Sequence, residues 1–200
     1  RAAAHKKVVV VLSNGSPVEM PWVNTVPAIL ESYLGGQAGA GAIADILYGK
    51  VNPSGKLAET FPVKLEDNPS YGCFPGGPQT IEYRESIYVG YRYYDTVAQD
   101  VLFPFGHGLS YSSFAYSNLK LNQAQGEIDS VTVTFTVKNS GKVAGKEAVQ
   151  VYVRDVQSTA FRPAKELKGF AKVELNPGDE TEVSIELDRR AFAFYDVDQR

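Results

Sequence analysis

Residues 130–141 read SVTVTFTVKNSG, and this stretch decides the fold of the second half of the chain. Valine or phenylalanine occupies every second position from Val131 to Val137, with threonines between them. Strict alternation of this kind is typical of a β-strand that buries one face and exposes the other. The closing Asn-Ser-Gly is a turn signal, so the strand is expected to end there.

The same alternation continues on both sides of this stretch. EAVQVYVRD (147–155) and TEVSIELD (181–188) repeat it, turn signals stand at NSGKVAGK (139–146) and LNPGDE (175–180), and FAYSNLKL (114–121) is a first strand. Short strands at this spacing, without a helical period, predict a β-sandwich of the immunoglobulin or fibronectin type.

The first half of the chain mixes strand-like and helix-like segments. VVVVL (8–12) is a continuous β-branched run, which predicts a parallel strand buried on both faces. PAILESYL (27–34) fits either a strand or a helix, and GGQAGAGAIADILYG (35–49) predicts a helix that stops at Gly49. These segments indicate an α/β layer, and the change to period two falls around FPFGHGLSY (103–111).

The composition disfavours several classes of function. The 200 residues are 44% hydrophobic and 22% charged, with a net charge of −3 and no stripe rich in Lys or Arg, so neither nucleic acid nor a membrane surface is an expected partner. Cys73 is the single cysteine, which excludes an internal disulfide, and the two histidines are distant in sequence. Because a structural zinc site needs more ligands than these, no metal is expected.

Two glycine-rich motifs could bind a nucleotide. Gly39, Gly41 and Ala44 match the G-x-G-x-x-A dinucleotide pattern, but no convincing acidic residue follows a second strand at the usual distance. Packing of small residues between a helix and a sheet is the favoured interpretation. The segment GKVNPSGK (49–56) differs from a phosphate loop in its spacing and ends before Leu57 in place of Ser or Thr, so it is rejected.

Nucleophilic catalysis would need an activated side chain. Neither Ser13 nor Ser110 lies in a G-x-S-x-G elbow, although Ser110 stands three residues after His107, and no pattern lowers the thiol pKa of Cys73. His107, between Gly106 and Gly108, is either a proton-transfer group or a hydrogen-bonding corner residue. We expect His107 to be a hydrogen-bonding corner residue.

Carboxylates gather in IEYRESIYVGYRYYD (81–95), which contains Glu82, Glu85 and Asp95. Glycoside hydrolysis needs two carboxyl groups facing each other across a sugar. Arg84 and Arg92 stand close in sequence, and a carboxylate beside a guanidinium keeps a low pKa, which suits an ion pair more than a general acid. We expect structural ion pairs on a strand and its flanks.

Longer phrases of the chain resemble family 3 glycoside hydrolases, the β-glucosidase family. The phrases are NGSPVEMPW, YLGGQAGAGAIADILYGKVNPSGKLAETFP, YRESIYVGYRYYD, FPFGHGLSYSSFAYSNLKL and RPAKELKGFAKVELNPGD, which occur in the family's order and approximate spacing. The resemblance covers nearly the whole chain. Ser86 is a departure, because the family more often has Gly there, and Ser is tolerated unless the position needs a positive φ.

The resemblance implies a modular enzyme with a (β/α)8 barrel, an α/β sandwich domain and a fibronectin type III-like domain. Residues 1–110 would be the C-terminal part of the α/β sandwich domain, and residues 111–200 the fibronectin-like domain without its last strand. A sandwich that lacks an edge strand exposes unpaired backbone groups and can associate, so an oligomer is possible.

The resemblance also implies a retaining double displacement without a cofactor. The nucleophile Asp and the acid/base Glu are expected upstream, so no catalytic residue is assigned in this chain. The substrate would be an oligosaccharide or glycoside with a terminal β-linked glucose, and the partner would be the barrel half, covalent or associated. The alternatives are a xyloside, arabinoside or N-acetylglucosaminide substrate, or a non-catalytic module that binds carbohydrate or packs on another domain.

Overall fold

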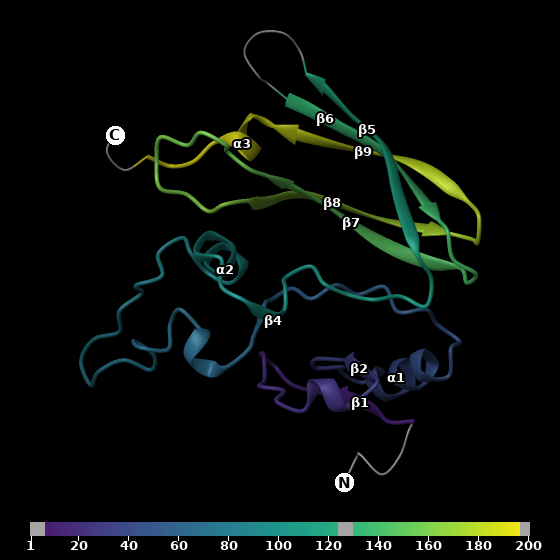
Figure 1. Ribbon diagram of the computed structural model, residues 1–200, viewed down its shortest axis with the longest axis horizontal. Helices are drawn as coiled ribbons and strands as arrows, with labels where there is room; N and C mark the ends of the chain where they lie inside the picture. The colour runs from purple at the N-terminus through teal and green to yellow at the C-terminus, as the bar shows by residue number, and fades with distance from the viewer. Residues whose placement is uncertain (1–6, 124–129, 197–200) are drawn as a thin grey trace. The chain divides into compact units, whose positions relative to one another are not determined.

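The computed structural model describes residues 7–123 and 130–196 (Figure 1). The chain forms two compact units. The first contains residues 7–51, Ala58–Tyr94 and Ala98–Phe105, and the second contains Asn52–Leu57, Asp95–Val97 and the described residues from Gly106 onward. Within the described ranges, no helix is long and apolar enough to cross a membrane.

The first unit begins with a parallel strand pair. β1 (Val9–Leu12) pairs with β2 (Ala28–Glu31) in parallel, a 3₁₀ turn (Val23–Thr25) lies between them, and α1 (Gly39–Leu47) follows. This order confirms the predicted α/β character and shows that 27–34 contains a strand. Within these residues Val9 and Val11 remain 49% and 38% exposed on one face of β1, so the predicted burial on both faces is not met inside this unit.

A second strand pair in this unit is antiparallel. β3 (Phe61–Pro62) pairs with β4 (Val101–Phe103), and the rings of Phe61 and Phe103 meet edge to face with centroids 6.3 Å apart. Phe61 is fully buried, so this pair forms a local core. A further 3₁₀ turn, Leu65–Asp67, follows β3.

The tyrosine-rich segment that ends at Asp95 forms a helix, which corrects the predicted strand. α2 (Tyr91–Val97) starts after Gly90 and ends at Ala98, which adopts a left-handed conformation. Aromatic residues favour strands, but here tertiary packing decides, because the Tyr94 side chain is buried and Tyr91 stacks on Phe105 with centroids 4.7 Å apart.

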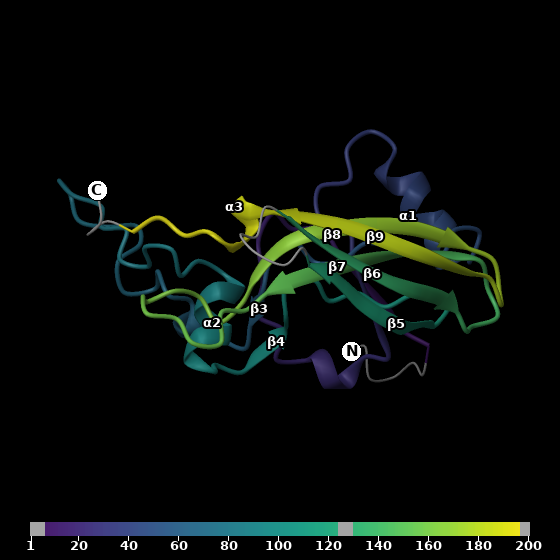
Figure 2. The ribbon, with the colours of Figure 1, turned by 90° about the horizontal axis from the view of Figure 1, so that it is seen from above.

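The second unit is an antiparallel β-sandwich (Figures 1 and 2). One sheet has the order β5 (Phe114–Gln123), β6 (Ser130–Asn139), β9 (Glu180–Asp188), and the other pairs β7 (Gly145–Val153) with β8 (Glu166–Leu175). The short helix α3 (Arg189–Phe192) follows β9. The buried core consists of Val133, Phe135, Val137, Val149, Leu175, Val183, Ile185, Leu187 and Ala191.

The sandwich confirms the fold class predicted from the sequence. The segments expected to form strands overlap β5, β6, β7 and β9, and Val133, Phe135 and Val137 of SVTVTFTVKNSG belong to the core. β8 was not predicted, because ELKGFAKVEL alternates only over its second half and Gly169 interrupts it.

Asn139, at the end of β6, is a fully buried polar residue, and every hydrogen-bonding group of its side chain has a partner. Its Nδ2 donates to the carbonyl oxygens of Val143 (2.9 Å) and Leu175 (3.0 Å). Its Oδ1 accepts from the Ser112 hydroxyl (2.6 Å) and the Gly141 N–H (3.0 Å). One amide therefore ties the start of the β6–β7 connection to the end of β8 and to the entry of β5.

Substituting Asn139→Ala should lower the free energy of unfolding by about 3 kcal/mol, because buried carbonyl and hydroxyl partners lose their bonds. Urea denaturation followed by circular dichroism measures the loss. The matched control is Asn122→Ala on the exposed side of β5, which should change stability by less than about 0.5 kcal/mol. Equal effects of the two substitutions would contradict this role for Asn139.

Candidate functional site

The segment Asn52–Leu57, which we call the clasp, lies against the corner that contains His107. The Leu57 N–H donates to the His107 carbonyl, and the Gly106 N–H donates back to the Leu57 carbonyl, both at 2.7 Å. Lys56 Nζ donates to the Gly108 carbonyl at 2.8 Å. The clasp and this corner therefore belong to one compact unit, the one that contains the sandwich.

Asn52 fixes the other end of the clasp. Its Oδ1 accepts from the Ser110 hydroxyl (2.9 Å) and the Tyr111 N–H (2.8 Å), and its Nδ2 donates to the Ala144 carbonyl (3.0 Å). A serine hydroxyl has one proton to donate, and that of Ser110 goes to Asn52 rather than to His107. The Ser13 hydroxyl donates to the Tyr33 carbonyl at 3.1 Å, so neither candidate serine directs its proton to a histidine.

The two glycines that flank His107 are needed for different reasons. Gly106 has φ +80°, a conformation that side chains with a Cβ rarely adopt. At Gly108 a Cβ would lie 2.3 Å from the Gly55 carbonyl oxygen of the clasp. The Gly-His-Gly sequence thus allows two backbone segments to approach closely.

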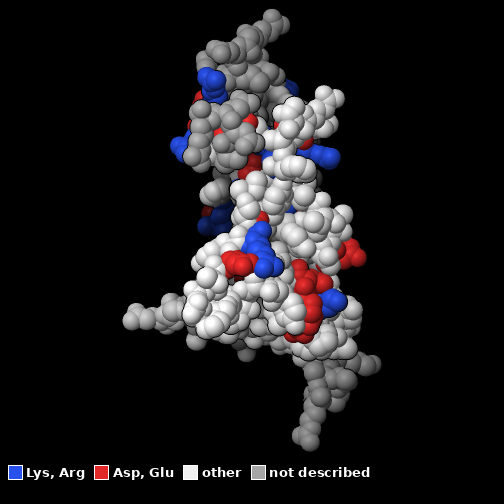
Figure 3. Space-filling view, turned by 90° about the vertical axis from the view of Figure 1, so that its left-hand side faces the viewer, with Lys and Arg blue, Asp and Glu red and all other residues white. Residues whose placement is uncertain are grey.

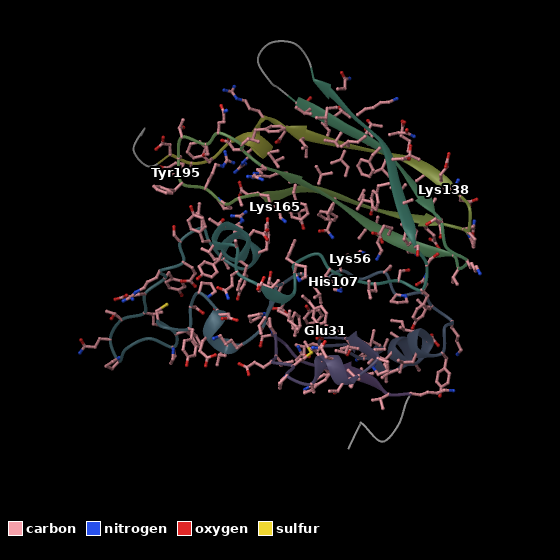
Figure 4. The ribbon with its side chains drawn as sticks, viewed as in Figure 1. Glu31, Lys56, His107, Lys138, Lys165 and Tyr195 are labelled. Carbon is pink, nitrogen blue, oxygen red and sulfur yellow. The ribbon has the colours of Figure 1, made fainter. Side chains whose placement is uncertain are left out.

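His107 is half-buried beside the clasp, and Figure 4 shows it close to Lys56. Burial lowers the pKa of His107, and the positive charge of Lys56 lowers it further. The folded protein therefore favours the neutral imidazole near neutral pH. The structure places His107 in a corner between β4 and β5, where the sequence predicted one.

Two of the three carboxylates named from the sequence lie in the expected ion pairs. Glu82 and Glu85 lie in a loop outside any strand, where Glu82 pairs with Arg84, and Asp95 on α2 pairs with Lys165 at 3.2 Å.

Glu82 and Arg84 line a hollow of about 280 Å³ formed by Gly72, Cys73, Phe74, Pro75, Gly76, Gly77 and Thr80. The Cys73 thiol there donates to the Ser70 carbonyl at 3.4 Å. On the face in Figure 3, charges of both signs lie interspersed.

The dinucleotide motif is not placed as nucleotide binding requires. Gly39 and Gly41 are residues of α1 itself, whereas the pattern places its glycines in the turn between strand and helix. The turn here is residues 32–38, so the small residues of α1 are better explained by helix packing. Among the described residues, no group of three or more His, Cys, Asp or Glu side chains could hold a metal ion.

A polar cluster that sequence reasoning missed lies at the carboxyl ends of β1 and β2. Glu31 Oε1 accepts from the Tyr33 N–H at 2.8 Å, and Tyr33 has φ +46°, an unusual conformation for a bulky residue. The buried side-chain oxygens that lack a hydrogen-bond partner in the described part of the chain include Asn14 Oδ1, Glu31 Oε2 and Glu59 Oε1. Ligands of α/β folds bind at this edge of the sheet.

The electrostatics of this cluster favour protonated groups. Burial raises the pKa of Tyr33 well above its usual range, and the Glu59 carboxylate raises it further. Burial also raises the pKa of Glu59, the charge of Glu31 adds to this, and the Tyr33 hydroxyl opposes it. Glu31 and Glu59 are 28 positions apart in sequence, so no motif could have indicated that they meet.

Comparison with known sequences places both halves of the chain. The sequence model of the glycosyl hydrolase family 3 C-terminal domain matches residues 1–111, and that of the fibronectin type III-like domain matches residues 147–200. Thermostable beta-glucosidase B of Acetivibrio thermocellus is 59% identical over 98% of this chain. An exo-alpha-(1->6)-L-arabinopyranosidase of Bifidobacterium breve is 46% identical over 97% of it. The chain spans 26% of each of these two relatives.

Solved structures agree with the sequence comparison. The family 3 beta-glucosidase of Bifidobacterium adolescentis has a TM-score of 0.93 and 47% identity, with 98% of this chain and 29% of that chain covered. The beta-glucosidase of Kluyveromyces marxianus in complex with glucose has a TM-score of 0.90 and 41% identity, with coverages of 95% and 23%.

The α/β unit followed in sequence by a fibronectin-like sandwich matches the C-terminal portion of these modular glycoside hydrolases. The match of the family 3 C-terminal domain to residues 1–111 of the 200-residue chain shows which family of glycoside hydrolases this is. The chain belongs to glycosyl hydrolase family 3.

Ser86, the departure from the family's usual Gly, adopts φ +51°. The position therefore does need a positive φ, and this chain accommodates it with a serine. A small polar residue carries a moderate cost in this conformation, whereas a β-branched residue would be strained.

Substituting Gly108→Ala should destabilise the chain by about 1–3 kcal/mol, because the new Cβ would collide with a backbone carbonyl of the clasp that cannot rotate away. Thermal denaturation measures the loss. Gly72→Ala is the matched control, because a Cβ there meets open space. If both variants melt alike, the close approach of the two segments does not limit stability.

The lowered pKa of His107 predicts a pH dependence of stability. The unfolded chain binds a proton at His107 more readily than the folded chain, so this contribution to stability is complete above the unfolded pKa of about 6.5 and is lost as pH falls through it. The urea midpoint of the wild type should therefore fall more between pH 7.5 and pH 5.5 than that of His107→Gln. Parallel pH profiles would show that His107 titrates alike in both states.

Proposed function

We propose that the complete protein is a β-glucosidase that releases terminal, non-reducing β-linked glucose from oligosaccharides or glycosides. The observation that carries this proposal is similarity along the whole chain to proteins of that name, at 59% identity over 98% of its length in one case. The solved Kluyveromyces marxianus relative was obtained in complex with glucose, which supports glucose as the sugar.

The proposed mechanism is a retaining double displacement, in which one carboxylate attacks the sugar and a second carboxyl protonates the leaving oxygen. We place both groups outside this chain, on the remaining length that the relatives have. In support, carboxylates of the second unit are engaged in ion pairs: Glu147 with Lys56 and Glu166 with Arg162, each at 3.2 Å. The chain's proposed role is therefore to support the site, with the barrel half as its partner.

The division of the chain at residue 110 is part of this proposal. The family domain matches up to residue 111, and the strands of the sandwich start at Phe114, which supports a boundary near that position. The sandwich is then the fibronectin-like domain and the preceding residues are the end of the α/β sandwich domain.

The test is a comparison of the complete protein with residues 1–200 alone on 4-nitrophenyl glycosides. The complete protein should hydrolyse the β-glucoside faster than the β-xyloside, the α-L-arabinoside and the N-acetyl-β-glucosaminide. Proton NMR of the first turnovers should show β-glucose before it mutarotates, as retention requires. The isolated chain should show no hydrolysis above buffer.

Different outcomes contradict different parts of the proposal. Hydrolysis by the isolated chain that persists after repurification would mean that catalytic groups lie within residues 1–200. A complete enzyme that prefers another glycoside would overturn the choice of glucose while leaving the family unchanged. First release of α-glucose would exclude retention.

A further inference from the structure

The clasp and its corner follow β7 along one side. Asn52 Nδ2 bonds the carbonyl of Ala144 just before the strand, Lys56 pairs with Glu147, and the Gln150 side-chain amide donates to the Gly106 carbonyl at 3.2 Å. β7 has β8 as its strand partner, and each of these contacts involves a side chain of the clasp or of β7.

The central contact of the clasp involves a buried charge. Lys56 Nζ lies 3.2 Å from Glu147 Oε2, and the two side chains are only 17% and 12% exposed. The Tyr116 hydroxyl of β5 donates to the other carboxylate oxygen at 2.9 Å. Burial raises the pKa of Tyr116 well above its usual range, and its bond to Glu147 adds to the effect, so this hydroxyl remains a donor.

A carboxylate in this position needs its cation. Removing one partner of a buried ion pair leaves an uncompensated charge, which is far more destabilising than removing both partners together. Of the two side chains that contact the Glu147 carboxylate, Lys56 and Tyr116, Lys56 carries the positive charge. Lys56 comes from the clasp, 91 positions before Glu147 in sequence.

We propose that the clasp is an obligatory part of the fibronectin-like sandwich, which holds its folded state only while Lys56 neutralises Glu147. The two matched domain ranges divide this pair, since Lys56 falls within residues 1–111 and Glu147 is the first residue of 147–200. The sandwich therefore depends on the clasp, a segment that lies within the matched range of the preceding domain.

The test is hydrogen–deuterium exchange of the 200-residue chain, read by mass spectrometry of peptides from β6 to β9. Lys56→Met keeps the aliphatic stem and removes the charge. It should speed exchange at least tenfold in β7 and β8.

The matched control is Lys138→Met, which breaks the Lys138–Glu180 pair at 3.4 Å on the other sheet, where the side chains are 49% and 58% exposed. Figure 4 shows Lys138 at a distance from Lys56 on the sandwich. An exposed ion pair contributes little to stability, so the exchange rate should change by at most about threefold to fivefold.

A second variant separates charge pairing from packing. In Lys56→Met combined with Glu147→Gln, no unpaired charge remains and Tyr116 keeps an acceptor, so the double variant should recover most of the lost protection. This comparison also applies if the single variant is too unstable to fold. Failure of the double variant to recover would overturn the role of the charge.

Faster exchange confined to the clasp, with β7 and β8 unchanged, would overturn the proposal, because the clasp could then detach from an intact sandwich. An effect of Lys56→Met no larger than that of Lys138→Met would do the same. None of these measurements uses hydrolytic activity, so the proposed β-glucosidase function can fail or hold independently.

Discussion

A buried carboxylate needs a cation, and in this chain Glu147 finds one outside its own sheet. The ion pair with Lys56 brings the clasp to β7, and the clasp in turn brings the Gly106–His107 backbone into a two-way hydrogen-bonded pair with Leu57. Backbone hydrogen bonds therefore hold the corner that leads into β5, in addition to any contact of the His107 ring. Lys56 also lowers the pKa of that ring, so the same cation fixes the geometry and the protonation of the corner.

The sandwich combines an ordinary apolar core with a few fully bonded polar residues at its ends. β6, β7 and β9 supply most of the core, which is what alternating strands provide. Such a core disfavours a slip of one residue, which would turn its buried side chains outward, whereas a slip of two residues would keep them on the core face. Asn139 and Asn52 bond to particular carbonyl groups near strand ends, and these directional bonds fix where each connection begins.

Much of the fold could be predicted from the sequence, and the elements that could not share a cause. Strands with strict alternation, such as β6 and β9, and the helix before Gly49 carry their signal within ten or fifteen residues. α2 lies in a segment where a strand was predicted, whereas the burial of Tyr94 favours the helix. β8 loses its alternation where Gly169 and the preceding charged residues stand.

The candidate sites depend on contacts that local pattern cannot reveal. Lys56 meets Glu147 across 91 positions, and the cluster of Glu31, Tyr33 and Glu59 forms across a strand–helix connection. GKVNPSGK (49–56) was considered as a phosphate loop and rejected because of its spacing, and nothing in these residues indicates that Lys56 meets Glu147. What could be recognised was the combination of phrases in order, which identifies a family without showing how its residues meet.

The constraints that hold this portion of the chain together are internal to it. They are the buried Lys56–Glu147 ion pair, the fully hydrogen-bonded Asn139 and the close backbone approach at Gly108. Each joins segments that are distant in sequence, so each acts on the folding of these residues rather than on a ligand. A fold stabilised in this way does not by itself specify what the protein acts on.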